Sequence, residues 1–128
     1  MHIFKTKEFS KWASKGRCSD AALRNAVDEM ESGLHNGNLG GNVYKKRVGV
    51  QGRGKSGGLR TLIAFKQGDK TFFIYGFAKN ERANISETEE KALKLLAKEL
   101  LGYSDAGLVK AVKAGELIEV RSNEKDDS

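Results

Sequence analysis

Lysine and arginine side chains gather in the central part of the chain, where their type and spacing suit the binding of phosphates. Residues 41–82 carry ten Lys and Arg against two Asp and Glu, whereas the rest of the chain carries thirteen against fifteen. Glycines and aromatic residues are interleaved with these cations. Arg can hold a phosphate with two parallel hydrogen bonds, and glycine lets the backbone approach it closely. The segment predicts a polyanion site, although a solvated lysine-rich surface would give a similar charge balance.

The string GVQGRGKS at residues 49–56 raises a more specific possibility, because it fits the P-loop pattern of nucleotide-binding enzymes. A P-loop needs a helix directly after its Lys-Ser pair, so that the helix N-terminus faces the phosphates. Here two glycines and then the strand-like run LRTLIAF follow. The sequence therefore favours a basic hairpin loop between two strands, in which Arg53 and Lys55 bind phosphate. An ordinary flexible hairpin with solubilising charges is the alternative.

Other catalytic chemistries find little support in the sequence. The two histidines are His2 and His35, no Cys/His cluster has metal-ligand spacing, and G-x-S-x-G is absent. We therefore expect no metal and no cofactor. The single Cys18 excludes an internal disulfide, and we see neither a membrane-spanning run nor a signal peptide. A cytoplasmic protein with no membrane association is expected.

The elements that must position the cations follow from the hydrophobic periodicity. Strand-like composition predicts three central strands, at residues 42–50, 59–66 and 71–79. The turn QGDK joins the last two of these strands as a tight hairpin. Helical patterns occupy residues 7–16, 21–33, 87–102 and 104–115. Short strands are also expected at each end of the domain, at residues 2–6 and 116–120.

These elements predict an α+β fold with two N-terminal helices, an antiparallel sheet of three to five strands, and a C-terminal helix or helices. Residues 1–121 would form a single domain, and the polar tail 122–128 would fray. The helix at 87–102 begins with a capping box formed by Ser86 and Glu89. Its expected core stripe consists of Ala92, Leu93, Leu96, Ala97 and Leu100.

Alternation along the first central strand divides its side chains between two faces. One face would carry the functional cations, and its members are Val43, Lys45 and Arg47. The other face would carry Tyr44, Lys46 and Val48. Lys79 and Arg82 come just after the third strand, where a site can be assembled from strand ends. Arg82 could instead pair with Glu81 or with a carboxylate of the following helix.

Two stretches of the chain carry a family resemblance. The combination of K-S-G-G-x-R at 55–60 and F-x-x-Y-G-F-x-K-x-x-R-x-N-I at 72–85 resembles the RelE/ParE toxin superfamily, and most of all its HigB-like branch. The likeness covers residues 40–101 well. It implies a fold like that of small microbial ribonucleases and a toxin of a type II toxin–antitoxin module. It also implies ribosome-dependent cleavage of mRNA in the A site without a metal, because the RNA 2′-OH is the nucleophile.

The resemblance also implies roles for individual residues. The motif Y-K-x-K matches Tyr44 to Arg47, which makes Lys45 the candidate base and Arg47 a phosphate contact. Arg60 matches the arginine that stabilises the transition state. Lys79 and Arg82 match further basic catalytic residues. The residues expected to contact RNA around this site are Lys46, Arg53, Lys55 and Asn80.

Two departures from the family pattern keep other functions open. Asn80 stands where RelE has an arginine, and Ser86 stands where RelE has a tyrosine near the scissile base. A ParE-like toxin that inhibits gyrase and a non-catalytic module that binds RNA or ribosomes are the alternatives. The implied partners are the ribosome, mRNA and an antitoxin of helix-turn-helix type, whose acidic segment would cover the basic face. Operator DNA would be bound only through the antitoxin.

Overall fold

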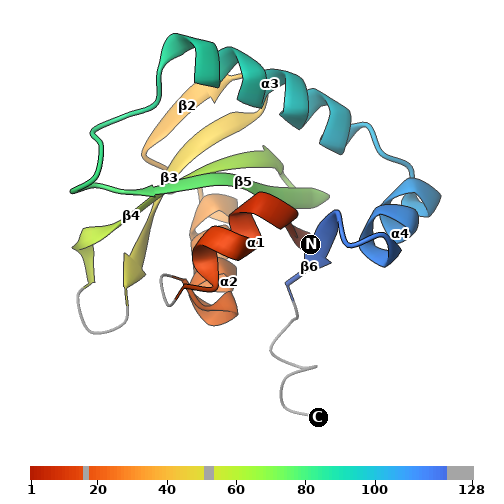
Figure 1. Cartoon of the computed structure of the whole chain (residues 1–128), viewed down its shortest axis with the longest axis horizontal. Coiled ribbons are helices and arrows are strands. Elements are labelled where there is room, and N and C mark those ends of the chain that lie inside the picture. The colour runs from red at the N-terminus through yellow and green to blue at the C-terminus, as the bar shows by residue number, and fades with distance from the viewer. Residues whose placement is uncertain (16–17, 51–53, 121–128) are drawn as a thin grey trace.

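The computed structural model describes residues 1–15, 18–50 and 54–120, with the backbone alone for 50 and 54–57. The elements follow one another along the chain as shown in Figure 1. They are β1 (His2–Thr6), α1 (Lys7–Ala13), α2 (Asp20–Glu31), β2 (Gly37–Gly40), β3 (Val43–Val50), β4 (Gly54–Lys66), β5 (Lys70–Ala78), α3 (Glu87–Leu101), α4 (Asp105–Lys113) and β6 (Leu117–Glu119). The predicted tail 122–128 and the loop residue Arg53 lie outside the described residues.

The six strands form one mixed sheet in the order β2-β3-β4-β5-β1-β6. β1 runs parallel to β5, and the other neighbours are antiparallel. The fold is α+β, but the predicted arrangement of two helices, an antiparallel sheet and C-terminal helices is wrong. The sheet begins before α1 and ends after α4, so helices and strands interleave. The outer strands β1 and β6 are short, and their sequences do not indicate which distant strand each of them pairs with.

Helices cover both faces of the sheet (Figure 1). On one face, α1 and α2 pack in a core cluster that includes Phe9, Leu23, Ile63 and Phe73. On the other face, α3 and α4 pack in a second cluster, here called the α3/α4 cluster. Its members include Val43, Leu62, Phe72, Phe77, Ala97, Leu100 and Leu108. Burial of these apolar side chains from water is the main force that holds the layers together. None of the helices within the described residues is long and apolar enough to cross a membrane.

Each helix begins at a hydroxyl side chain that caps its N-terminus. The caps accept a hydrogen bond from a backbone N–H in the first turn, and they are Thr6, Ser19, Ser86 and Ser104. The capping box predicted for Ser86 and Glu89 is present. The predicted core stripe of α3 is right for Ala97 and Leu100, which are buried, and wrong for Ala92, which is exposed. The buried side chains of α3 lie in its second half.

The hairpins hold the functional strands in register. The predicted tight turn between β4 and β5 is confirmed, and Gly68 adopts the left-handed φ of +76° that it requires. β3 and β4 pair as antiparallel neighbours, with Val50 opposite Gly54. A strand rather than a helix therefore carries Lys55 and Ser56. This excludes the P-loop and confirms that the glycine-rich loop joins two strands.

One close approach fixes β5 against α1. A Cβ atom added at Gly76 would lie 2.6 Å from Cε3 and 2.7 Å from Cη2 of Trp12. No carbon can occupy that space unless the indole ring moves. Gly76 lies between Tyr75 and Phe77, whose side chains point toward the opposite face of the sheet. The contact between Gly76 and Trp12 therefore sets how closely α1 approaches β5 on the face opposite those two side chains.

Candidate functional site

The predicted alternation along β3 is confirmed. Val43 packs in the α3/α4 cluster, whereas Tyr44 and Val48 pack with the α1 and α2 cluster. Lys45 and Arg47 therefore lie on the side of the sheet that faces α3. The backbone N–H of Arg47 donates a 2.7 Å hydrogen bond to Oδ1 of Asn36, the residue just before β2. This bond extends the attachment of β3 past the first residue of β2.

Cross-strand pairing assembles a wider site around these two cations. Arg47 stands opposite Arg60 on β4, which in turn stands opposite Phe77 on β5. One step further along, Lys45 stands opposite Leu62, which stands opposite Tyr75. Paired residues of neighbouring strands share a face. The basic face, as we call it, thus consists of Lys45, Arg47, Arg60, Tyr75 and Phe77.

Arg60 occupies the centre of the basic face. Its Nη1 atom is buried and has no hydrogen-bond partner among the residues that the structure describes. Burial, and next the positive charge of Arg47, lower the pKa of Arg60 below its ordinary value of 12.5. A buried donor without an acceptor is costly for a folded protein, and a ligand is one physical reason for its presence. A phosphate oxygen would both satisfy Nη1 and relieve the repulsion between the two arginines.

Arg82 lies beside the aromatic side chains of the basic face and forms four hydrogen bonds with protein groups. Its two terminal nitrogens bind both carboxylate oxygens of Glu89 at the start of α3. Nη1 also donates to Tyr75 Oη at 3.1 Å, and Nε donates to the carbonyl oxygen of Asn84 at 3.0 Å. The guanidinium carbon lies 5.7 Å from the centre of the Phe77 ring. Arg82 therefore ties the loop after β5 to α3 and orients Tyr75.

The pKa values of the two partners follow from this bidentate pair. The hydrogen bond from Arg82, and next one from the Ser86 backbone, lower the pKa of Glu89 from 4.5 to about 2. The same bond with Glu89 raises the pKa of Arg82. Sequence analysis had left open that Arg82 pairs with a carboxylate of the following helix, and Glu89 of α3 is that carboxylate.

Comparison with known proteins gives the family of the chain. The family model for the RelE toxin of the RelE/RelB toxin–antitoxin system matches residues 1–120. The chain belongs to the RelE toxin family. Toxins of the RelE family belong to toxin–antitoxin systems, are generally ribonucleases, and have an antitoxin as partner. No curated protein matches the chain.

The structure does not bring every predicted residue of this candidate site together. Lys46 lies on the opposite face, where its side chain is 5% exposed and its Nζ lies 2.8 Å from the Glu29 carboxylate of α2. Lys79 and Asn80 are exposed in the turn that follows β5. Lys55 lies on β4, but its side chain is outside the described residues, as is all of Arg53.

The candidate site also contains residues that sequence reasoning did not assign to it. The Arg82 guanidinium lies over the ring of Phe77, and Glu89 binds that guanidinium through hydrogen bonds. The motif around Tyr75 and Phe77 was visible in the sequence, but the register that sets Phe77 beside Arg60 was not. Among the described residues, no group of three or more His, Cys, Asp and Glu side chains could hold a metal ion.

Proposed function

We propose that this RelE-family toxin is a ribosome-dependent endonuclease that cleaves mRNA in the ribosomal A site. The observation that carries the proposal is the pair of arginines at the centre of the basic face, with the buried Nη1 of Arg60 lacking an acceptor. Such a pair suits a phosphate that gains charge during reaction. Tyr75, which is half-buried, supplies aromatic surface beside it that suits a nucleic-acid base, while Phe77 is buried beneath.

The reaction we propose is an internal transphosphorylation that needs no metal. The RNA 2′-oxygen forms a bond to the adjacent phosphorus while the bond from phosphorus to the 5′-oxygen breaks. Lys45 assists removal of the 2′-OH proton by accepting it. The departing 5′-oxygen takes a proton from solvent water, with Lys79 as the cation proposed to favour its negative charge. Arg47 and Arg60 hold the phosphate oxygens and stabilise the charge that develops on them. The products are a 2′,3′-cyclic phosphate and a 5′-hydroxyl end.

Arg82 is better described as a positioning residue than as a free cation. Its terminal nitrogens are occupied by Glu89 and Tyr75, so it acts on the substrate through the orientation of Tyr75. Asn80, Arg53 and Lys55 are proposed as RNA contacts around the reacting phosphate. Asn80 replaces a family arginine, so it offers hydrogen bonds in place of charge.

The cellular setting belongs to the same proposal. The toxin would act in the cytoplasm, where ribosomes carry its substrate. It would belong to the HigB-like branch, which the motifs at 55–60 and 72–85 resemble. Its antitoxin would be of helix-turn-helix type and would be the component that binds operator DNA. These statements rest on the sequence resemblance.

Controlled expression followed by mapping of transcript 5′ ends tests the proposal. We expect new ends at codons within translated regions, and none after translation initiation has been blocked. The Arg60→Ala variant should give no such ends while folding normally. DNA damage with intact mRNA would instead indicate gyrase inhibition, and ribosome binding without any cleavage would indicate a non-catalytic module.

A further inference from the structure

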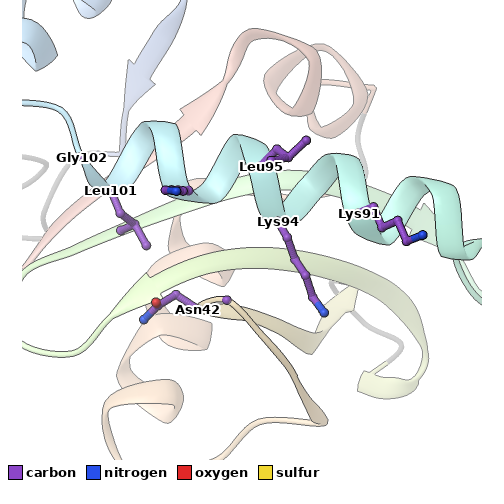
Figure 2. Close-up of a pocket in the computed structure, with 8 residues that line it drawn as sticks. Asn42, Lys91, Lys94, Leu95, Leu101 and Gly102 are labelled. Atoms are coloured by element: carbon purple, nitrogen blue, oxygen red, sulfur yellow. The ribbon is translucent and has the colours of Figure 1, made fainter.

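A second surface, built from residues outside the basic face, lies along α3. A groove of about 730 Å³ separates this helix from the turn between β2 and β3. Its walls are Gly41 and Asn42 of the turn and Lys91, Lys94, Lys98 and Leu101 of α3. Figure 2 shows Lys94 reaching from the helix toward the turn. We call this surface the α3 groove.

The turn beneath the groove has a fixed, compact shape. Gly40, Gly41 and Asn42 all adopt positive φ, at +87°, +62° and +63°. The stem of Lys94 packs across this turn, since a Cβ atom added at Gly41 would lie 3.4 Å from Lys94 Cγ. Nζ of Lys94 forms an ion pair with Glu90 at 3.1 Å. Lys94 is therefore a fixed part of the groove wall.

The outer stripe of α3 next to the groove combines charge with exposed apolar surface. Lys91, Leu95 and Lys98 follow one another at helical spacing, so they lie on one side of the helix. Leu95 is 71% exposed, and Lys91 and Lys98 are also exposed. Neither lysine forms an ion pair with any carboxylate among the described residues. The stripe thus presents a leucine between two uncompensated positive charges.

We propose that the α3 groove and this stripe are the docking site for an acidic, amphipathic segment of the antitoxin. Carboxylates of that segment would pair with Lys91 and Lys98, and its apolar side chains would cover Leu95 and Leu101. An RNA backbone would match the charge but would leave Leu95 in water, so the apolar component favours a protein partner. The inference rests on the antitoxin partner of the family and does not depend on the proposed RNA cleavage.

Affinity measurements with the full-length antitoxin test the docking site. The toxin is purified with Arg60→Ala, and binding is followed by calorimetry at two salt concentrations. We expect the double variant Lys91→Glu/Lys98→Glu to raise Kd at least about tenfold and to weaken the dependence on salt. Leu95→Ser should raise Kd by a similar factor through lost apolar contact. A matched control, Lys11→Glu/Lys110→Glu on α1 and α4, changes the net charge equally and should leave Kd within about threefold.

The outcomes separate this proposal from its alternatives. Thermal melting confirms that each variant is folded, which is expected because all the altered side chains are exposed. Unchanged antitoxin affinity in both the lysine and the leucine variants would overturn the docking site. If the lysine variant loses ribosome affinity but keeps antitoxin affinity, the surface binds RNA and the proposal is also wrong. Calorimetry does not need an active enzyme, so the measured antitoxin affinities can still be interpreted if the nuclease proposal fails.

Discussion

Arg60 stands directly opposite Arg47 on the neighbouring strand, and the two guanidinium groups repel each other on one face of the sheet. Like charges at opposed positions destabilise a sheet, and the buried Nη1 of Arg60 adds a further cost. An arrangement that is unfavourable in the free protein becomes favourable once an anion lies between the charges. This relationship is the physical basis of the proposed site.

Replacing Arg60 by alanine should abolish mRNA cleavage and leave the fold intact. If Arg60 acts like one oxyanion-type donor, the rate should fall by about 10²–10³, or about 2.7–4 kcal/mol of barrier. Cleavage of ribosome-bound mRNA in a purified translation system measures the rate. Lys66→Ala, an exposed cation on the same strand, is the matched control and should cleave normally. Full activity in the Arg60 variant would remove this arginine from the mechanism.

Replacing Glu89 by glutamine should change how stability depends on pH in acid. Glu89 has a pKa of about 2 in the folded protein and an ordinary value of 4.5. Folding therefore favours its ionised form, so its contribution is fully present above pH 4.5 and is lost as pH falls through 2. Urea unfolding between pH 5 and pH 2 should show a shallower loss of stability for Glu89→Gln. Identical slopes for the two proteins would mean that the pair with Arg82 does not form in solution.

Replacing Lys46 by methionine should lower stability but spare cleavage. Lys46 points away from the basic face and pairs with Glu29, so its loss leaves a partly buried carboxylate without this cation. Breaking a fully buried pair costs about 3–5 kcal/mol, and the partial exposure of Glu29 makes the lower end the expectation. Chemical denaturation measures the loss, and cleavage is assayed well below the melting temperature. If the Lys46→Met toxin is folded but no longer binds RNA, Lys46 contributes to RNA binding after all.

Replacing Gly76 by alanine should destabilise the protein by about 1–3 kcal/mol, because the new methyl group collides with Trp12. The double variant with Trp12→Leu tests the cause. The effect of Gly76→Ala should be smaller in that background, since the smaller side chain leaves room for the methyl group. Equal effects in both backgrounds would show that the indole ring is not the constraint.

Parts of this site could be read directly from the sequence. The alternation along β3 correctly put Lys45 and Arg47 on one face and Lys46 on the other, because side chains on a strand alternate between faces. The expectation that Lys46 contacts RNA beside them did not follow from that alternation. The glycine-rich string was correctly placed between strands, because two glycines, which are poor helix starters, and a strand-like run follow it. These predictions depend only on local preferences, which the sequence carries in full.

The remaining parts depend on distant contacts. Pairing counted outward from the turn at 67–69 would set Arg60 opposite Gly76. An irregularity between Leu62 and Ile63 shifts the register by one residue and sets Phe77 opposite Arg60 instead. The parallel pairing of β1 with β5 and the choice of Glu89 as the partner of Arg82 likewise arise only when the chain is folded.

The two edges of the sheet have a consequence for how the toxin meets other chains. β2 at one edge has four residues and β6 at the other has three, so each offers very few backbone groups for pairing with a foreign strand. Short edges protect a sheet protein against edge-to-edge aggregation. They also leave little room for an inhibitor that binds by adding a strand. We therefore expect a partner that neutralises this toxin to gain most of its affinity from side chains.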